Sequence, residues 1–139
     1  GCHPYGEALF NRCVYGVFDP VGYGADGKYG NEWDMTIWIS DRGIESGRLK
    51  DILIHEAAHA YSYLVLRGCV VPDGSSFREL AHKRYGDEEH LADVFVLYYG
   101  GKWTNYDGRE NIPIRDRSWM SNMIDYCNLY EEALATLSS

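Results

Sequence analysis

The sequence lacks any apolar run that approaches the roughly 20 residues of a membrane-spanning helix, and it has no internal repeat or low-complexity tract. It is also poor in positive charge: 13 Lys and Arg stand against 21 Asp and Glu, a formal net charge of −8. Because nucleic acids and anionic membranes attract basic side chains, we expect neither as a partner. At 139 residues and 45% hydrophobic composition, the chain predicts one globular domain over residues 1–139.

Cysteine is scarce and scattered. Cys2, Cys13, Cys69 and Cys127 form no Cys-x-x-Cys pair, so neither a zinc ribbon nor a redox motif is indicated. An even number of dispersed cysteines in a small domain favours two disulfides, and hence an extracellular compartment. Three pairings are possible; we prefer Cys2 with Cys13 and Cys69 with Cys127, with four reduced thiols in a cytosolic protein as the alternative. The sequence opens on Gly1 without a signal peptide, so we expect a mature or trimmed chain.

Histidine is scarce too, with five in the chain, yet two of them fall four residues apart in an apolar stretch, I-L-I-H-E-A-A-H-A-Y. This stretch holds the pattern H-E-x-x-H at His55, Glu56 and His59. Residues four apart share a helix face, so both imidazoles can be directed at one zinc ion. Glu56 projects beside that point, where it can act as a general base on a water molecule. The alternative is an ordinary amphipathic helix, but buried His and Glu side chains need partners, and a metal supplies one.

A catalytic zinc site normally has three protein ligands and a water molecule. Glu89 and Asp93 lie four residues apart on a second predicted helix and share a face of it. One can bind the metal while the other accepts an N–H from a ligand histidine. Asp93 and His90 remain alternatives to Glu89 as the third ligand, although His90 points about 100° away from Glu89. His82, on a preceding short helix, is interpreted as an ordinary surface or core histidine.

Taken together, H-E-x-x-H and the later E-H-L-A-D resemble the zincin metallopeptidases of the gluzincin type, in which a distal Glu is the third ligand. Val94-Phe95 extends the likeness to small bacterial zinc peptidases that have E-x-x-A-D-x-F at this point. The resemblance covers residues 33–96. It departs from the family at Val96, where a small residue is expected, and in a longer interval that admits a helix over 76–85.

The resemblance implies a minimal zincin-like domain with one Zn²⁺ per chain. His55, His59 and Glu89 would be the ligands, Glu56 the catalytic base, and Asp93 the acceptor of an N–H from His55. The implied function is that of a secreted zinc metalloendopeptidase, a hydrolase in which a metal-activated water attacks a peptide or protein substrate. In zincins, the strand that here covers residues 34–40 commonly pairs with the substrate; a purely structural edge is the alternative.

Two other functions stay open. One is a zinc-containing binding or regulatory domain with no or very restricted proteolysis, and the other is a disulfide-stapled structural protein without metal. The sequence does not set the oligomeric state, and a monomer is compatible with it. The residue that stabilises the oxyanion is also not identified. The candidates for it are Tyr98, Tyr99, Tyr106, His82 and Arg109.

The predicted fold class is α+β, with a small mixed or antiparallel sheet packed on the H-E-x-x-H helix and a second, ligand-bearing helix. The predicted elements are a helical turn near 7–11, strands at 13–18 and 33–40, a turn about 26–27, and helices at 47–66, 76–85, 88–99 and 119–137. Ser46, Ser76, Asp87 and Ser118 are the expected N-caps of the four helices.

Overall fold

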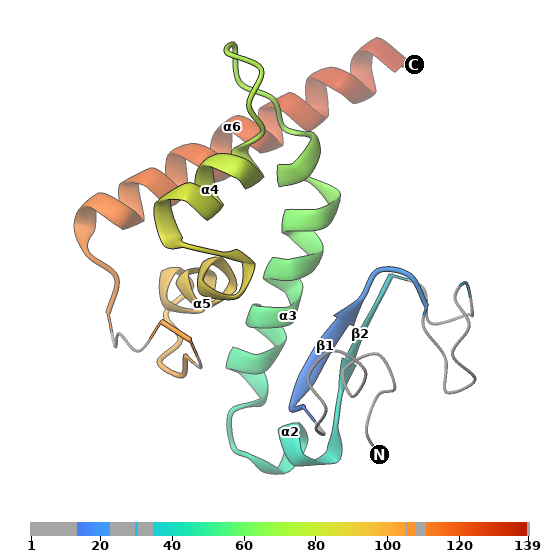
Figure 1. The fold of residues 1–139 in the computed structure, drawn as a ribbon, viewed down its shortest axis with the longest axis vertical. Coiled ribbons are helices and arrows are strands. Elements are labelled where there is room, and N and C mark those ends of the chain that lie inside the picture. The colour runs from blue at the N-terminus through green and yellow to red at the C-terminus, as the bar shows by residue number, and fades with distance from the viewer. Residues whose placement is uncertain (1–13, 23–29, 31–34, 105, 108–110, 139) are drawn as a thin grey trace. The chain divides into compact units, whose positions relative to one another are not determined.

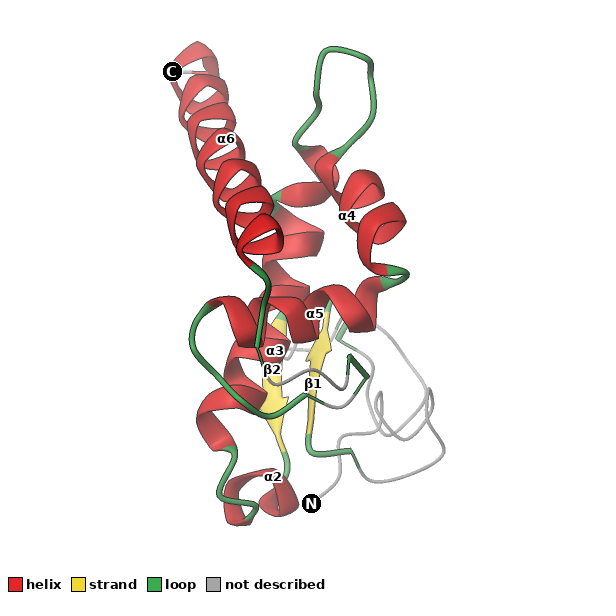
Figure 2. Ribbon diagram, turned by 90° about the vertical axis from the view of Figure 1, so that its left-hand side faces the viewer, coloured by secondary structure: helices red, strands yellow, loops and turns green. Residues whose placement is uncertain are grey.

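The structure, a computed structural model, describes residues 14–22, 30, 35–104, 106–107 and 111–138 (Figure 1). Three predictions lie outside these ranges: the helical turn near 7–11, the turn about 26–27 and the Cys2–Cys13 disulfide. The described elements are β1 (Gly16–Asp19), β2 (Thr36–Ile39), α2 (Asp41–Glu45), α3 (Leu49–Leu64), η1 (Leu66–Gly68), α4 (Phe77–Tyr85), α5 (Glu88–Tyr98) and α6 (Ile114–Ser138). Helices dominate beside one small sheet (Figure 2). The α+β prediction is therefore confirmed.

The chain divides into two compact units, Gly1–Ala60 and Tyr61–Ser139. The boundary falls inside α3, which continues through it as one helix, Leu49–Leu64. The sequence contains no linker at this point, and the prediction of a single domain stays a prediction.

In the first unit, β1 and β2 pair antiparallel, with Gly16 opposite Ile39 and Asp19 opposite Thr36. Both strands have four residues and are shorter than predicted. β1 ends because the buried Asp19 carboxylate turns back to accept the backbone N–H groups of Val21 and Gly22, at 3.1 and 2.8 Å. The sheet, predicted to be mixed or antiparallel, is antiparallel in the described residues. The end of β1 is set by side-chain chemistry that alternation does not reveal.

β1 packs closely against α3 at Gly16. A Cβ at this position would lie 2.9 Å from Cγ2 of Ile52 and 3.2 Å from Cγ of Glu56. These separations are shorter than ordinary van der Waals contact, so any larger residue would push the strand and the helix apart. Glycine therefore fixes how near the sheet comes to the helix that carries the H-E-x-x-H motif.

The short helix α2, directly after β2, is not among the predicted elements. Ser40 caps α2 by accepting the N–H of Gly43 at 3.2 Å. A glycine inside a helix is unusual, but here a Cβ would collide with the carbonyl oxygen of Tyr15. Ser46 closes α2, and its hydroxyl also accepts the N–H of Arg48 at 3.1 Å. As a result α3 begins at Leu49, two residues later than predicted.

In the second unit, two of the predicted caps are confirmed. Ser76 accepts the N–H of Glu79 at 3.1 Å and opens α4, and Asp87 accepts the N–H of His90 at 2.9 Å and opens α5. The prediction for α6 was wrong at its start. The helix begins at Ile114 rather than Trp119, because the carbonyl of Pro113 already accepts the N–H groups of the residues three and four positions later.

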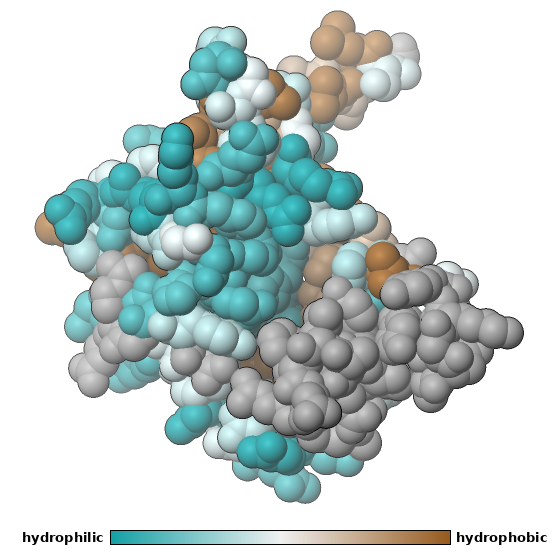
Figure 3. Space-filling view, in the orientation of Figure 1, coloured by the Kyte–Doolittle hydropathy of each residue, from teal (hydrophilic) through white to brown (hydrophobic). Residues whose placement is uncertain are grey.

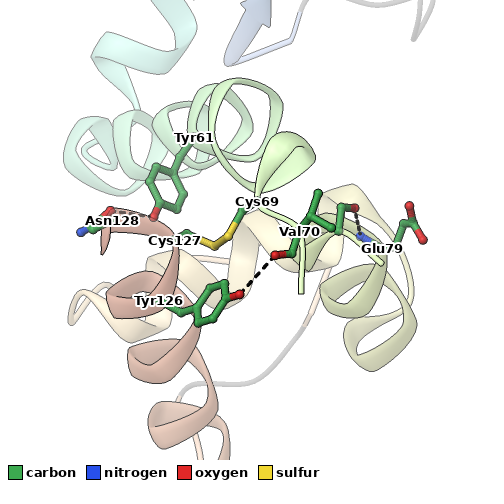
Figure 4. The surroundings of a disulfide bond; sticks show 8 residues. Tyr61, Cys69, Val70, Glu79, Tyr126, Cys127 and Asn128 are labelled. Carbon is green, nitrogen blue, oxygen red and sulfur yellow. Dashed lines mark hydrogen bonds between the residues drawn. A yellow bond between two sulfur atoms is a disulfide. The ribbon is translucent and has the colours of Figure 1, made fainter. Parts of the chain in front are cut away.

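The disulfide Cys69–Cys127 joins the segment after α3 to the middle of α6, with the two Cα atoms 5.6 Å apart (Figure 4). Both cysteines are fully buried. Two hydrogen bonds accompany the disulfide: Tyr61 donates to the side-chain carbonyl of Asn128 at 3.0 Å, and Tyr126 donates to the carbonyl of Val70 at 3.2 Å. This half of the predicted pairing is confirmed.

Helix α6 also packs on α4. The ring of Phe77 is in edge contact with the ring of Trp119, and Arg84 forms a salt bridge of 2.8 Å with the buried carboxylate of Asp116. Most of the visible surface around α4 is hydrophilic, while hydrophobic residues gather at the C-terminal end of α6 (Figure 3). None of the described helices combines the length and the apolar character needed to cross a membrane.

Candidate metal centre

Helix α3 presents the H-E-x-x-H motif on its buried side. His55 and Glu56 are each 6% exposed, and Ile52 and Ala58, which flank them in sequence, are 2% and 4% exposed. Leu53, on the opposite side, is 42% exposed. The helix therefore buries titratable side chains among apolar ones, which costs free energy unless they have partners.

The two imidazoles converge. Nε2 of His55 and Nε2 of His59 lie 3.1 Å apart, and the rings meet edge to face at 82° with their centroids 4.7 Å apart. Two nitrogen ligands at about 2.0–2.1 Å from a tetrahedral zinc ion are ~3.3 Å from each other. Two neutral imidazoles can also share one proton at such a distance, so the pair alone does not distinguish a hydrogen bond from a metal site.

Glu89, near the N-terminus of α5, completes the group. One ligand atom from each of His55, His59 and Glu89 lies within 4.8 Å of the others, and in the described part of the chain no other cluster of three or more His, Cys, Asp or Glu could hold a metal ion. This limit is wider than the roughly 3.3 Å between ligand atoms of a closed tetrahedral site. The donor set, two imidazoles and a carboxylate, fits a catalytic zinc site, although the group does not by itself identify the metal.

Glu56 belongs to the motif but not to this group. Its Oε1 lies 3.8 Å from Nε2 of His55. Its Cγ packs against Gly16, 3.2 Å from the position that a Cβ on that residue would take. The carboxylate is thus buried beside the paired imidazoles. A proton acceptor in this position can serve a water molecule held between the metal ligands.

Asp93 is fully buried and accepts the backbone N–H groups of Tyr106 and Asp107, the second at 2.9 Å. It therefore holds the segment that follows α5. Its predicted hydrogen bond with His55 stays a prediction. His90, the other alternative ligand, directs its Nδ1 at the Asp87 carboxylate, 2.8 Å away, and this hydrogen bond raises the pKa of His90. Neither residue is part of the three-residue group.

His82 was interpreted as an ordinary histidine, but it takes part in a cluster that the sequence did not reveal. Its Nε2 lies 2.7 Å from Oε1 of Glu88, and the same oxygen accepts a hydrogen bond of 2.7 Å from the hydroxyl of Ser62. Acidic residues such as Glu88 are common in the first turn of a helix, where they interact favourably with the helix dipole. No local pattern joins residues that are 26 positions apart in sequence.

The candidates for oxyanion stabilisation are placed as follows. The hydroxyl of Tyr98 is 2.7 Å from that of Ser121, while burial raises the pKa of the Tyr99 hydroxyl. The ring centroid of Tyr106 lies 6.3 Å from that of His90. Arg109 lies outside the described residues.

No family model, curated protein or solved structure matches this chain. Any functional interpretation therefore rests on the motif and on the geometry around it.

Proposed function

We propose that the chain is a zinc-dependent metalloendopeptidase of the gluzincin type. The observation that carries the proposal is the 3.1 Å approach of the His55 and His59 Nε2 atoms, with the carboxylate of Glu56 buried at 3.8 Å from the first of them. Glu89 provides the third ligand from α5. A structural zinc site has no need of an additional, non-ligating carboxylate, whereas peptide hydrolysis needs a base in that position.

When bound, zinc lowers the pKa of a water molecule towards about 7 and polarises a carbonyl. The chemistry left to the protein is proton transfer. Glu56 accepts the proton of the attacking water and then delivers it to the leaving nitrogen of the cleaved peptide bond. The Cγ of Glu56 packs closely against the backbone of β1 at Gly16, which limits the movement of this side chain.

Secretion is part of the proposal. The Cys69–Cys127 disulfide supports it, because such bonds persist in oxidising compartments and are rare in reducing ones. The substrate would be a peptide or protein. In the described residues β2 pairs with β1 alone, and a strand at the edge of a sheet is a suitable template for an extended peptide.

The second candidate is a zinc-containing binding or regulatory domain with no or very restricted proteolytic activity. The low exposure of His55 and Glu56, 6% each, favours it, because a substrate carbonyl must reach the metal ion and the water molecule beside these two side chains. The two functions make opposite predictions for the base, because a binding domain would retain its properties without Glu56.

The deciding experiment replaces Glu56 with Gln, which keeps the shape of the side chain but removes its basicity. We expect the wild-type protein to cleave members of a mixed peptide library and Glu56→Gln to lose activity by a factor of at least about 100, while both bind the same amount of zinc. The matched control is Glu132→Gln, an exposed position on α6, which should behave as wild type. Equal cleavage by Glu56→Gln would contradict the mechanism, and no cleavage by the wild type would favour the binding domain.

A further inference from the structure

A hydrogen-bonded cluster around Glu88 joins residues of the second unit that come from three helices. Oε1 of Glu88, on α5, accepts the hydroxyl of Ser62 from the last turn of α3 at 2.7 Å. The same oxygen lies 2.7 Å from Nε2 of His82 and 3.4 Å from Nε of Arg78, both on α4. Arg78 also donates to the hydroxyl of Ser62 at 3.1 Å. One carboxylate oxygen is thus the common acceptor for groups from α3 and α4.

The burial of Ser62 shows that this contact is specific. Its side chain is fully buried, and a buried hydroxyl without a partner costs about 1–3 kcal/mol. The side chains of Glu88, Arg78 and His82 retain 24%, 29% and 31% of their exposure. Ser62, at the inner end of the cluster, is therefore shielded from water, while Glu88, Arg78 and His82 at the outer end remain partly exposed. This pattern is expected of an interaction that sets the spacing between helices.

The cluster is next to the proposed ligands in both sequence and helical geometry. Ser62 follows His59 by three residues on α3, so the two lie about 60° apart around the helix on neighbouring turns. Glu88 directly precedes Glu89 on α5, about 100° around that helix. Glu88 can therefore hold α5 against Ser62 on α3, while the side chain of Glu89 leaves α5 in a different direction from that of Glu88.

The combination of Ser, His and Glu does not indicate a nucleophilic serine. In such an enzyme the serine hydroxyl gives its proton to the histidine. Here the hydroxyl of Ser62 and the imidazole of His82 both point at Glu88, and Ser62 is fully buried. The carboxylate is the centre of the cluster, and its role is to hold other groups in place.

We propose that Glu88 is a positioning residue for the metal centre: by binding Ser62, His82 and Arg78 it fixes α5 against the last turn of α3 and so brings Glu89 to the two histidines. This inference rests on the proposed function, because it takes Glu89 as a metal ligand. Loss of a group that supports a metal ligand typically weakens metal affinity about 10–100-fold. The cluster should therefore influence zinc binding although none of its members binds zinc.

The test measures zinc affinity by competition with a chelator, together with the visible spectrum of the cobalt(II)-substituted protein, for wild type, Glu88→Ala and Glu88→Gln. We expect Glu88→Ala to lose affinity about 10–100-fold and to change the cobalt spectrum, because the ligand helix is released. Glu88→Gln keeps an oxygen that can accept from Ser62 and Arg78, so it should recover most of the affinity. Glu132→Ala, which removes a charge from an exposed position on α6, should match wild type.

Circular dichroism of each variant shows whether it is folded. If Glu88→Ala does not fold, Ser62→Ala decides, because it removes a single hydroxyl and should still weaken zinc binding several-fold with a changed cobalt spectrum. Wild-type zinc affinity and an unchanged cobalt spectrum in the folded variants would overturn the positioning role and leave the proposed function intact. Failure of the wild type to bind zinc would overturn the proposed function, and this inference with it.

Discussion

His55 and His59 bring their Nε2 atoms to within 3.1 Å of each other from successive turns of one helix, on its buried side. Side chains at this spacing share a face in any helix, but their ring nitrogens meet only when both rotamers direct them at the same point. Glu89 offers a third ligand atom within 4.8 Å of a ring nitrogen of each histidine, and the three residues could hold a metal ion. The remaining predictions concern what holds this arrangement together.

Gly16 is predicted to be essential for the packing of β1 on the motif helix. Gly16→Ala places a methyl group 2.9 Å from Ile52 Cγ2 and 3.2 Å from Glu56 Cγ, so it should destabilise the protein by about 1–3 kcal/mol and displace the Glu56 carboxylate. Urea denaturation measures the stability. Gly68→Ala is the matched control, because a Cβ at Gly68 meets nothing within 4 Å. Equal stability of the two variants would show that the close contact is not present in solution.

The Cys69–Cys127 disulfide closes a loop with a sequence separation of 58 residues. Removing it by the double substitution Cys69→Ala and Cys127→Ala should cost about 2–5 kcal/mol, because the unfolded chain regains the entropy of that loop. Thermal unfolding with and without a reducing agent checks this: the reduced wild type should unfold at a temperature near that of the double variant. A midpoint unaffected by reduction would contradict the bond.

Asp87 is predicted to stabilise α5 in a pH-dependent way. Its carboxylate accepts the backbone N–H of His90, and this hydrogen bond, followed by the one to the His90 side chain, lowers its pKa. Because the folded pKa is below the unfolded value of about 3.9, the stabilisation is complete above that value and is lost as the pH falls through the folded pKa.

Asp87→Ala should therefore cost about 0.5–2 kcal/mol at neutral pH and less in acid. Asp87→Asn keeps a capping oxygen and should lose less at neutral pH, without the acid dependence of the carboxylate. Denaturation curves from pH 2 to pH 7 compare the three proteins. A constant difference between wild type and Asp87→Ala over this range would contradict the titration.

The sequence predicts what is encoded locally. Ser76 and Asp87 were recognised as caps because a capping side chain lies within three residues of the N–H that it accepts. The four-residue spacing of His55 and His59 predicted a shared face for the same reason. Cys69 with Cys127 was a preference among three pairings, and only tertiary structure could decide it.

What the sequence did not reveal depends on long-range contacts. Helix α2 was missed because Gly43 suggests a turn, and the carbonyl of Tyr15 that requires a glycine there belongs to another element. The contact of Ser62 with Glu88 was missed because each residue has an ordinary explanation within its own helix. An acidic residue in the first turn of a helix, such as Glu88 in α5, is common, so its partners on two other helices could not be inferred.

The most direct test of the metal centre is the zinc content of the purified wild type and of Glu89→Ala, measured by elemental analysis after the same zinc loading and dialysis. We predict about one zinc ion per wild-type chain and a large loss in Glu89→Ala, since a site with only two histidines binds zinc weakly. Full retention of zinc by Glu89→Ala would transfer the third ligand to Asp93 or His90. The absence of zinc from the loaded wild type would contradict the account.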